Sequence, residues 1–405
     1  MSIYRIGCVD SNVATDAAFK KAFFAIYHKY LPDEQERFRD DDKKRWNHWK
    51  KVAGQPIKKL QLELKKLGFL PNAKGDGIFG YATQAAVRLF QEHVRNQDGN
   101  TKIGTPDGVV GPKTQKFIDK YLEDEHQSVW ASGIKGRPTA IYQEWISILD
   151  RVKEHYRTNP SPGVKALNEQ AKKSASLPLS EWNFKQQAQL IGIRRNAHNP
   201  KADRGNDDLF IFLFGGQALY FWGSTDPKVR GLRQDEPYLA EGQHLYDYGF
   251  HLISNRNKTY RGLRPADEKG VRVFRDHANH NSLSAKNMAK GVDKVANNTI
   301  NIHWSGEGRS NWSAGCQVIS GRNYIDQNDQ LVNCKAYAAV GNADLGSGRT
   351  KAAYNVFTDL LLLYGGRDVE QMRYTLLHDD VLREVHPMAF RYLERQIKRL
   401  KTNKN

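Results

Sequence analysis

One eight-residue pattern occurs twice in the first third of the chain and constrains the fold more than any other feature. "DGIFGYAT" (Asp76 to Thr83) is followed 31 residues later by "DGVVGPKT" (Asp107 to Thr114), so both copies read D-G-apolar-apolar-G-x-x-T. The glycines supply tight turns, and Asp76 and Asp107 can accept hydrogen bonds from nearby backbone amides. Each copy leads into helix-like sequence, so we expect Thr83 and Thr114 to be N-caps.

An upstream segment extends this module. In "IKKLQLELKKLGFL", leucines are spaced for one face of a helix that ends near Gly68. The stretch from about 55 to 122 resembles the small three-helix peptidoglycan-binding domain of many wall enzymes. The resemblance is carried by Leu60-Gln61, Leu67-Gly68-Phe69, both repeat copies and Phe90-Gln91. It implies peptidoglycan as a partner, with Asp76 and Asp107 as candidate substrate-binding residues. The alternative is a small helical module with no ligand.

Length and charge set wider bounds. With 405 residues, the chain is too long for one ordinary core and indicates two domains with connecting segments. The formal charge of +17 predicts attraction to polyanions, namely nucleic acid, an anionic membrane or bacterial cell wall. No zinc-finger, RNP or helix-turn-helix pattern is recognised, so nucleic acid is not the expected partner. No apolar run approaches the roughly 18 to 20 residues of a membrane span.

The N-terminus and the cysteines bear on localisation. The first sixteen residues have no sustained apolar segment, so we expect synthesis in the cytoplasm without a cleaved signal, and Cys8 is not expected to be a lipoprotein cysteine. Three widely spaced cysteines argue against a disulfide framework, although a bridge between Cys316 and Cys334 stays an open alternative. The segment "TDAAFKKAFFAIYHKYL", with Asp16 as N-cap, predicts a helical packing arm or a docking segment.

The second half of the chain has the pattern of a β domain. Short apolar runs such as Leu209 to Phe214 are separated by turn residues. We therefore predict an α+β protein, a three-helix binding domain followed by a mostly β catalytic domain. The expected boundaries are 1–50 for the charged arm, 51–124 for the binding domain, 125–187 for a partly helical connector, 188–380 for the catalytic domain and 381–405 for a basic helix and tail.

One cysteine lies where a nucleophile is expected. Cys316 follows a polar, glycine-containing loop and precedes an apolar pair, which predicts a thiol at the edge of a strand. A free thiol is only a few per cent ionised at neutral pH, so a nucleophile needs a neighbouring base. His303, thirteen residues upstream at the end of a strand-like run, is the candidate. Ser313 would support the substrate, and the amides of Ala314, Gly315 and Cys316 would form an oxyanion hole.

The segment "HWSGEGRSNWSAGCQVISG" resembles the catalytic segment of L,D-transpeptidases, cysteine enzymes that act on peptidoglycan stem peptides. Their motif of histidine, loop, serine, variable residue, glycine and cysteine corresponds to His303, Ser313, Gly315 and Cys316. The resemblance implies a β-rich catalytic domain and no cofactor or metal. His251, Trp312 and Ala314 are further candidates for substrate contact. This sequence departs from the family at Ala314, where many members have a second histidine, and at Val318, where arginine or asparagine is usual.

Two other functions compete with this one. A zinc peptidase could use Asp276, His277 and His280 of "DHANH", but no H-E-x-x-H pattern occurs. A non-catalytic wall-binding protein would not need Cys316. The sequence as a whole predicts a peptidoglycan enzyme acting by L,D-transpeptidation, D-amino-acid exchange or L,D-carboxypeptidation. Because the expected substrate lies in the envelope, we expect a contact-dependent effector, such as a type VI effector with an immunity protein, or a phage-derived wall hydrolase.

Overall fold

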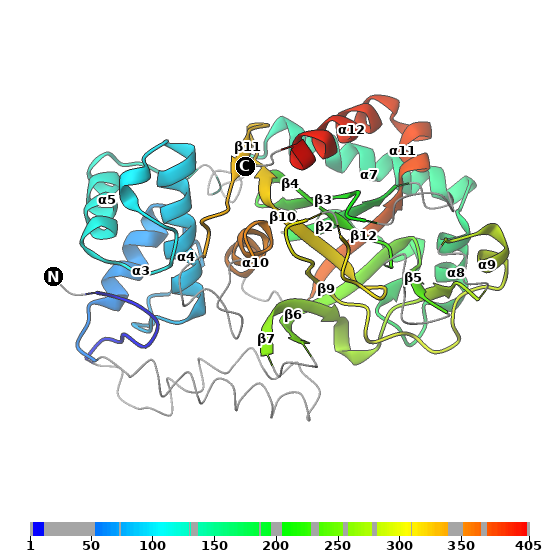
Figure 1. Cartoon of the computed structure of the whole chain (residues 1–405), viewed down its shortest axis with the longest axis horizontal. Coiled ribbons are helices and arrows are strands. Elements are labelled where there is room, and N and C mark those ends of the chain that lie inside the picture. The colour runs from blue at the N-terminus through cyan, green and yellow to red at the C-terminus, as the bar shows by residue number, and fades with distance from the viewer. Residues whose placement is uncertain are drawn as a thin grey trace. The chain divides into compact units, whose positions relative to one another are not determined.

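The protein forms two compact units in a computed structural model, and each is described separately (Figure 1). The first comprises Met1–Arg137, Gly249–Arg261 and Asn333–Asp368, and the second comprises Pro138–Tyr248, Gly262–Val332 and Val369–Asn405. The structure describes residues 3–11, 53–72, 74–128, 130, 137–185, 188–195, 205–227, 235–253, 258–277, 282–308, 310–338, 351–365 and 371–402. The predicted helical arm, including Asp16, lies outside these residues.

Three helices form the centre of the first unit, as the repeat pattern predicts. They are α3 (Ile57–Lys66), α4 (Tyr81–Glu92) and α5 (Pro112–Glu123), with the short turns η2 (His93–Gln97) and η3 (Thr101–Ile103) between α4 and α5. Leu60, Leu64 and Leu67 are buried on one side of α3 and just beyond it. The spacing of these leucines therefore marks the face of α3 that packs into the core.

The two repeat loops are held by the same hydrogen bonds. Gln61 donates from Nε2 to Asp76 Oδ1 at 2.7 Å and to Thr83 Oγ1 at 3.1 Å, and its Oε1 accepts from the Gly77 amide. In the second repeat Gln91 makes the equivalent bonds with Asp107, Thr114 and Gly108. Each aspartate also accepts from the amide two residues later, as predicted from the turn chemistry.

The helix caps differ from the expectation. The N-caps of α4 and α5 are Gly80 and Gly111, and neither helix has a side-chain cap bond. Thr83 and Thr114 lie one turn further in and are buried. Their hydroxyls bond to the repeat glutamines and to backbone carbonyls, so these threonines stabilise the loop rather than the helix terminus.

Segments distant in sequence complete the first unit. Residues 3–11 form antiparallel bridges to both repeats, Tyr4 with Val110 and Val9 with Ile78. Asp10 accepts a hydrogen bond of 2.6 Å from the amide of Ile57 and so caps α3. Helix α10 (Ala353–Tyr364), predicted to lie in the catalytic domain, packs on α4 instead. The predicted limits 188–380 therefore include a helix of the other unit.

A buried ion cluster joins α10 to α4. Arg88 Nε and Nη2 donate to the two carboxylate oxygens of Asp359 at 2.8 and 2.9 Å. Arg261 also donates to this carboxylate, and Tyr337 donates its hydroxyl at 2.6 Å. Burial alone would raise the pKa of Asp359, but Arg88 and Arg261 hold it below its ordinary value. The ionised carboxylate is the counter-ion that the two guanidinium groups share.

The second unit is built on a large mixed sheet. Its strand order is β1-β6-β12-β2-β3-β4-β10-β9-β7, with β11 beside β10 and a further pairing between β6 and β7. β5 and β8 form a separate pair. The strands are β1 (Ser176–Leu177), β2 (Ala188–Arg194), β3 (Asp208–Phe214), β4 (Gln217–Ser224), β5 (Pro237–Leu239), β6 (Gly242–Ile253), β7 (Lys258–Pro265), β8 (Val273–Arg275), β9 (Ile302–Trp304), β10 (Gln317–Ile325), β11 (Leu331–Asn333) and β12 (Met372–His378).

Helices cover one face of the central strands. They include α7 (Ala140–Thr158) and α12 (Pro387–Thr402), which both pack on β4, and α11 (Asp379–Val385), which packs on β12 and against α7 and α12 (Figure 1). α8 (Pro162–Gln170) and α9 (Ala285–Ala289) lie near β5, and η4 (Leu179–Glu181) and η5 (Ala266–Glu268) are short turns. Trp145, Ile211 and Leu393 belong to the core that the covering helices share with the sheet. The segment predicted as a connector therefore contributes α7 and α8 to this unit.

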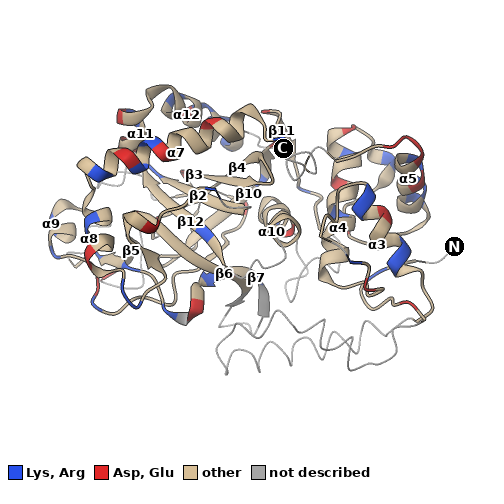
Figure 2. Cartoon of the chain, turned by 180° about the vertical axis from the view of Figure 1, so that it is seen from behind, with Lys and Arg blue, Asp and Glu red and all other residues tan. Residues whose placement is uncertain are grey.

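The charges are mixed along the helices rather than gathered on one of them. Figure 2 shows blue Lys and Arg interspersed with red Asp and Glu along α5, α7 and α11. Among the described helices, none has the length and apolar composition that a membrane crossing requires.

Candidate active site

Cys316 lies immediately before β10, as the sequence predicts for a thiol at the edge of a strand. β10 pairs in parallel with β9, and Val318 is the register partner of His303. Because side chains alternate along strands, Cys316 and His303 are expected on the same face of the sheet, offset by about 7 Å along the strands. The Cys316 Sγ accepts from the amide of Asn301 and donates to the carbonyl of Thr299, each at 3.3 Å. The side chain is partly exposed.

His303 is held in one tautomer. Its Nδ1 lies 2.8 Å from the carbonyl oxygen of Trp304, which can only accept, so Nδ1 carries the proton. In the neutral ring, Nε2 then has the lone pair and can act as a base. Burial lowers the pKa of His303 to about 4, and the hydrogen bond to Trp304 only partly offsets this effect. The imidazole is therefore neutral at pH 7, which suits a general base rather than a resting ion pair with the thiol.

Ser313 has a different place from the one expected. Its hydroxyl donates to the carbonyl of Cys316 at 2.7 Å and accepts from the amide of Gly315 at 3.1 Å. Ser313 is 4% exposed, and its two hydrogen bonds hold the turn before the cysteine. The Gly315 amide is engaged in the same turn, which removes it from the three amides predicted as an oxyanion hole.

Gly315 is required by the path of the backbone. Its φ of +135° lies in the region that favours glycine, and a Cβ there would lie 2.6 Å from Pro237 Cγ and 2.8 Å from Pro237 O. The absence of a side chain therefore lets the turn pack against the segment of β5. We expected Gly315 to contribute its amide to an oxyanion hole, whereas the close approach that requires a glycine here is to Pro237 within the protein.

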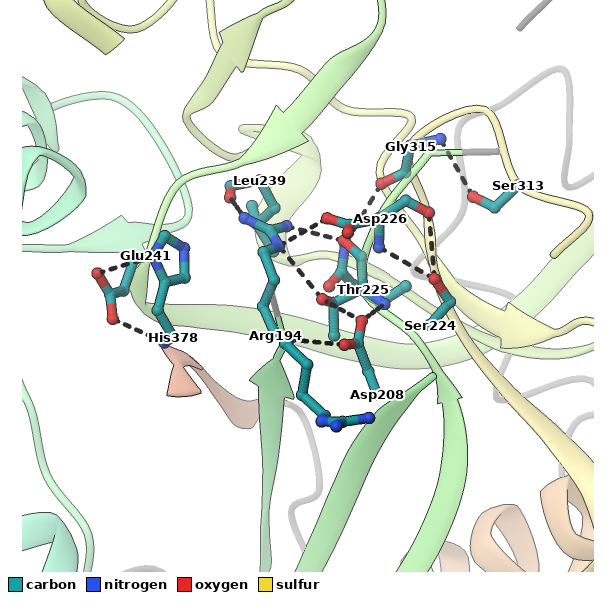
Figure 3. Close-up of polar contacts among 12 residues, drawn as sticks. Arg194, Asp208, Ser224, Thr225, Asp226, Leu239, Glu241, Ser313, Gly315 and His378 are labelled. Carbon is teal, nitrogen blue, oxygen red and sulfur yellow. Dashed lines mark hydrogen bonds and ion pairs between the residues drawn. The ribbon is translucent and has the colours of Figure 1, made fainter. Parts of the chain in front are cut away.

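Buried polar residues that the sequence analysis did not identify support the turn. Asn311 accepts from the Ser313 amide and donates to the carbonyl of Asp226, and Gln317 donates to the carbonyls of Gly315 and Thr225. Figure 3 shows the turn beside Thr225 and Asp226, with Arg194 on their other side. In the sequence, the one signal for Arg194 is that a charged residue ends an otherwise largely apolar strand-like run.

Arg194 partly neutralises the buried carboxylates that lie behind the turn. Its side chain is fully buried, forms an ion pair of 3.0 Å with Asp226, and donates to the carbonyls of Thr225 and Leu239. Asp208 accepts from the Thr225 amide at 2.6 Å. Burial and the charge of Asp226 raise the pKa of Asp208. The turn therefore rests on a buried network of charged side chains.

The remaining predicted residues are dispersed. Trp312 is 70% exposed and Ala314 is exposed, so both are accessible beside the thiol. His251 lies on β6, but its side chain is outside the described residues. The carboxylates of Asp76 and Asp107 are engaged inside the repeat loops of the first unit.

The alternative zinc set is only partly described. Asp276 accepts a hydrogen bond of 2.8 Å from Asn287, and His277 is exposed. His280 lies outside the described residues. Among the described residues, Asp276 and His277 do not belong to any group of three potential metal ligands.

The second unit also contains a pocket of about 140 Å³ between α7, α8 and α11. Glu241, at its wall, accepts from the hydroxyl of Tyr156. It also accepts from the amide of His378 at 2.8 Å (Figure 3). His155 lies 3.2 Å from Glu384 at the same pocket. Cys316 and His303 do not line it. The thiol and this pocket are therefore separate features.

Comparisons with known proteins identify the helical module. Residues 53–118 match the family described as "Putative peptidoglycan binding domain". The chain carries a peptidoglycan-binding domain. This domain and the β-rich unit give a mixed α+β protein, as the sequence predicts at this level of detail.

Two further comparisons add little. The comparison with curated proteins gave no match. A solved structure titled as a fused Zn-dependent amidase/peptidase/peptidoglycan-binding domain-containing protein, from Clostridium acetobutylicum ATCC 824, aligns over 65% of this chain and 94% of that chain. The two are 13% identical and the TM-score is 0.20, too low for an argument from the likeness.

Proposed function

We propose that the protein is a peptidoglycan-modifying cysteine enzyme that acts on stem peptides through a thioester on Cys316. One observation carries the proposal. The partly exposed thiol of Cys316 precedes β10, and the adjacent parallel strand β9 bears His303, a neutral histidine whose tautomer is fixed. A peptidoglycan-binding domain in the same chain supports the choice of substrate.

The chemistry balances with these two side chains. His303 Nε2 takes the thiol proton while the sulfur attacks the carbonyl carbon that joins the third stem residue to the terminal D-alanine. The carbon–nitrogen bond then breaks, the imidazolium returns its proton to the leaving amine, and the acyl group stays on sulfur as a thioester. A second stem's amine, a free D-amino acid or water resolves the thioester, giving transpeptidation, exchange or carboxypeptidation.

The supporting residues have positioning roles in this mechanism. Ser313 and Asn311 fix the turn, and Arg194 fixes the backbone on which the turn rests. A low pKa of His303 makes its protonated form a strong acid, which favours protonation of the leaving amine. The same low pKa makes the neutral imidazole a weak base, so ionisation of the thiol is the harder half of the cycle.

The test is to incubate the full-length protein with tetrapeptide muropeptides and to follow their masses. Loss of D-alanine or a change in crosslinking should occur with the wild type and with Cys334→Ala, which removes a buried thiol of the other unit. It should be absent in Cys316→Ala. Unchanged muropeptides with the wild type would refute the enzyme proposal.

A non-catalytic wall-binding protein is the second candidate, because the family match supports binding alone. Sedimentation with purified sacculi separates the two functions. Wild type and Cys316→Ala should bind equally, since the substituted residue is outside the peptidoglycan-binding domain. Binding without any Cys316-dependent change of the muropeptides would favour the second candidate.

The site of action follows from the proposed substrate, which lies in the bacterial envelope. Delivery as an antibacterial effector, for instance by a type VI system with a cognate immunity protein, belongs to the same proposal, as does a phage-derived wall enzyme. Expression in a Gram-negative host with and without an added periplasmic signal tests it. Toxicity should require the signal and Cys316, whereas equal toxicity from the cytoplasm would contradict an envelope target.

A further inference from the structure

Three potential metal ligands converge at one end of the first unit. Helix α4 continues into the π-helical turn η2, which begins at His93, and Asp98 follows this turn. His126 lies just beyond α5, where its amide donates to the carbonyl of Tyr121. The ligand atoms of these three side chains all lie within 4.8 Å of one another. The two repeats thus bring together residues 33 positions apart, which no sequence motif marks.

The distances fit one tetrahedral ion. His93 Nε2 lies 3.0 Å from His126 Nε2 and 3.7 Å from Asp98 Oδ1. Zinc–nitrogen and zinc–oxygen bonds are about 2.0 to 2.2 Å long, so adjacent ligands of a tetrahedral zinc are separated by roughly 3.3 Å. The two observed separations lie on either side of that value.

The surroundings of the Asp98 carboxylate also suit a cation. Tyr121 donates its hydroxyl to Asp98 Oδ2 and so orients the carboxylate. Among the described residues, no lysine or arginine forms an ion pair with Asp98. A metal ion would supply the missing positive charge.

Aromatic rings enclose the protein side of the cluster. Phe69 and Trp130 pack edge-on against His93, and Tyr121 packs against His126 with ring centroids 4.5 Å apart. The side chain of Asp98 is 32% exposed, which leaves a path from solvent. These apolar rings exclude water on one side, which strengthens the electrostatic interaction between an ion and its ligands. The exposed side, at Asp98, still lets the ion enter.

We propose that His93, Asp98 and His126 bind one divalent transition-metal ion, with zinc the best match to two imidazoles and a carboxylate. Three protein ligands leave a fourth position for water. The ion would join the end of the first repeat to the end of the second and so stabilise the peptidoglycan-binding domain. This site is independent of the chemistry proposed for Cys316.

The competing explanation is a direct hydrogen bond between two neutral imidazoles, and Co²⁺ distinguishes the two. Chelator-treated full-length protein is titrated with Co²⁺, followed by visible absorption, and then with Zn²⁺ as competitor. We expect tetrahedral Co²⁺ bands that zinc abolishes, and a thermal midpoint that rises when either metal is added. His126→Ala and Asp98→Ala should each weaken binding by more than about ten-fold. The control His155→Ala, at the pocket of the other unit, should bind as the wild type does.

Folding of the variants is checked without metal. Their circular dichroism should equal that of the chelated wild type, because His126 and Asp98 are both partly exposed. Binding that persists unchanged in both variants would overturn the proposal, as would a wild type that gives no tetrahedral Co²⁺ spectrum.

Discussion

Removing the Asp359 carboxylate should release α10 from α4. In Asp359→Ala, the two guanidinium groups of Arg88 and Arg261 stay buried without their shared counter-ion. Breaking a buried ion pair by removing one partner costs about 3 to 5 kcal/mol. Asp359 is fully buried and also accepts from Tyr337, so we expect the upper half of that range.

Hydrogen exchange measured by mass spectrometry localises this effect. Since about 1.4 kcal/mol is a factor of ten, amides of α4 and α10 should exchange on the order of 700- to 4,000-fold faster in the variant. Strands β2 to β4 of the second unit serve as the internal reference. Lys59→Ala is the matched control, because it removes an exposed i,i+4 pair with Glu63 that contributes less than about 0.5 kcal/mol. Exchange in α4 and α10 that changes by only a few-fold in Asp359→Ala would refute the role given to the cluster.

Three other perturbations test the second unit and the thiols. Iodoacetamide should alkylate Cys316 faster than Cys8 or Cys334, which are each 1% exposed, and equal rates by peptide mass mapping would contradict the accessible thiol. Gly315→Ala should lower the stability of the second unit by about 1 to 3 kcal/mol in urea denaturation, because the new Cβ meets Pro237, and an unchanged midpoint would reject the described turn. Burial lowers the pKa of His244 to about 4, so its stabilising contribution, up to about 3 kcal/mol, is present above the unfolded pKa near 6.5 and is lost as pH falls towards 4. His244→Gln should flatten the dependence of the urea midpoint between pH 7 and pH 4, whereas a slope as steep as in the wild type would rule out this assignment.

The helical module could be predicted because its signals are local. Turn residues, glycines and leucine spacing act over a few positions, and they located α3, α4 and α5. The position of α10 could not be predicted, since Arg88 and Asp359 are 271 residues apart and each alone resembles an ordinary surface charge in a helix. The bridges of residues 3–11 to both repeats were missed for the same reason.

The candidate site shows the same division. Cys316 and His303 were identified from the loop between two strand-like segments, and the parallel pairing of β9 and β10 brings their strands together. The roles of Ser313 and Gly315 could not be deduced, because they depend on Cys316 O and on Pro237, which only the folded turn brings near. Arg194 and Asp226 support the turn from β2 and from the end of β4, so their importance arises from tertiary contacts alone.

Intact-protein mass spectrometry during reaction with a tetrapeptide stem tests the central claim most directly. The account predicts a transient adduct of one stem lacking its terminal D-alanine, located on Cys316, released by hydroxylamine and absent in Cys316→Ala. Turnover of the stem peptide that leaves Cys316 unmodified, or that continues in Cys316→Ala, would contradict it.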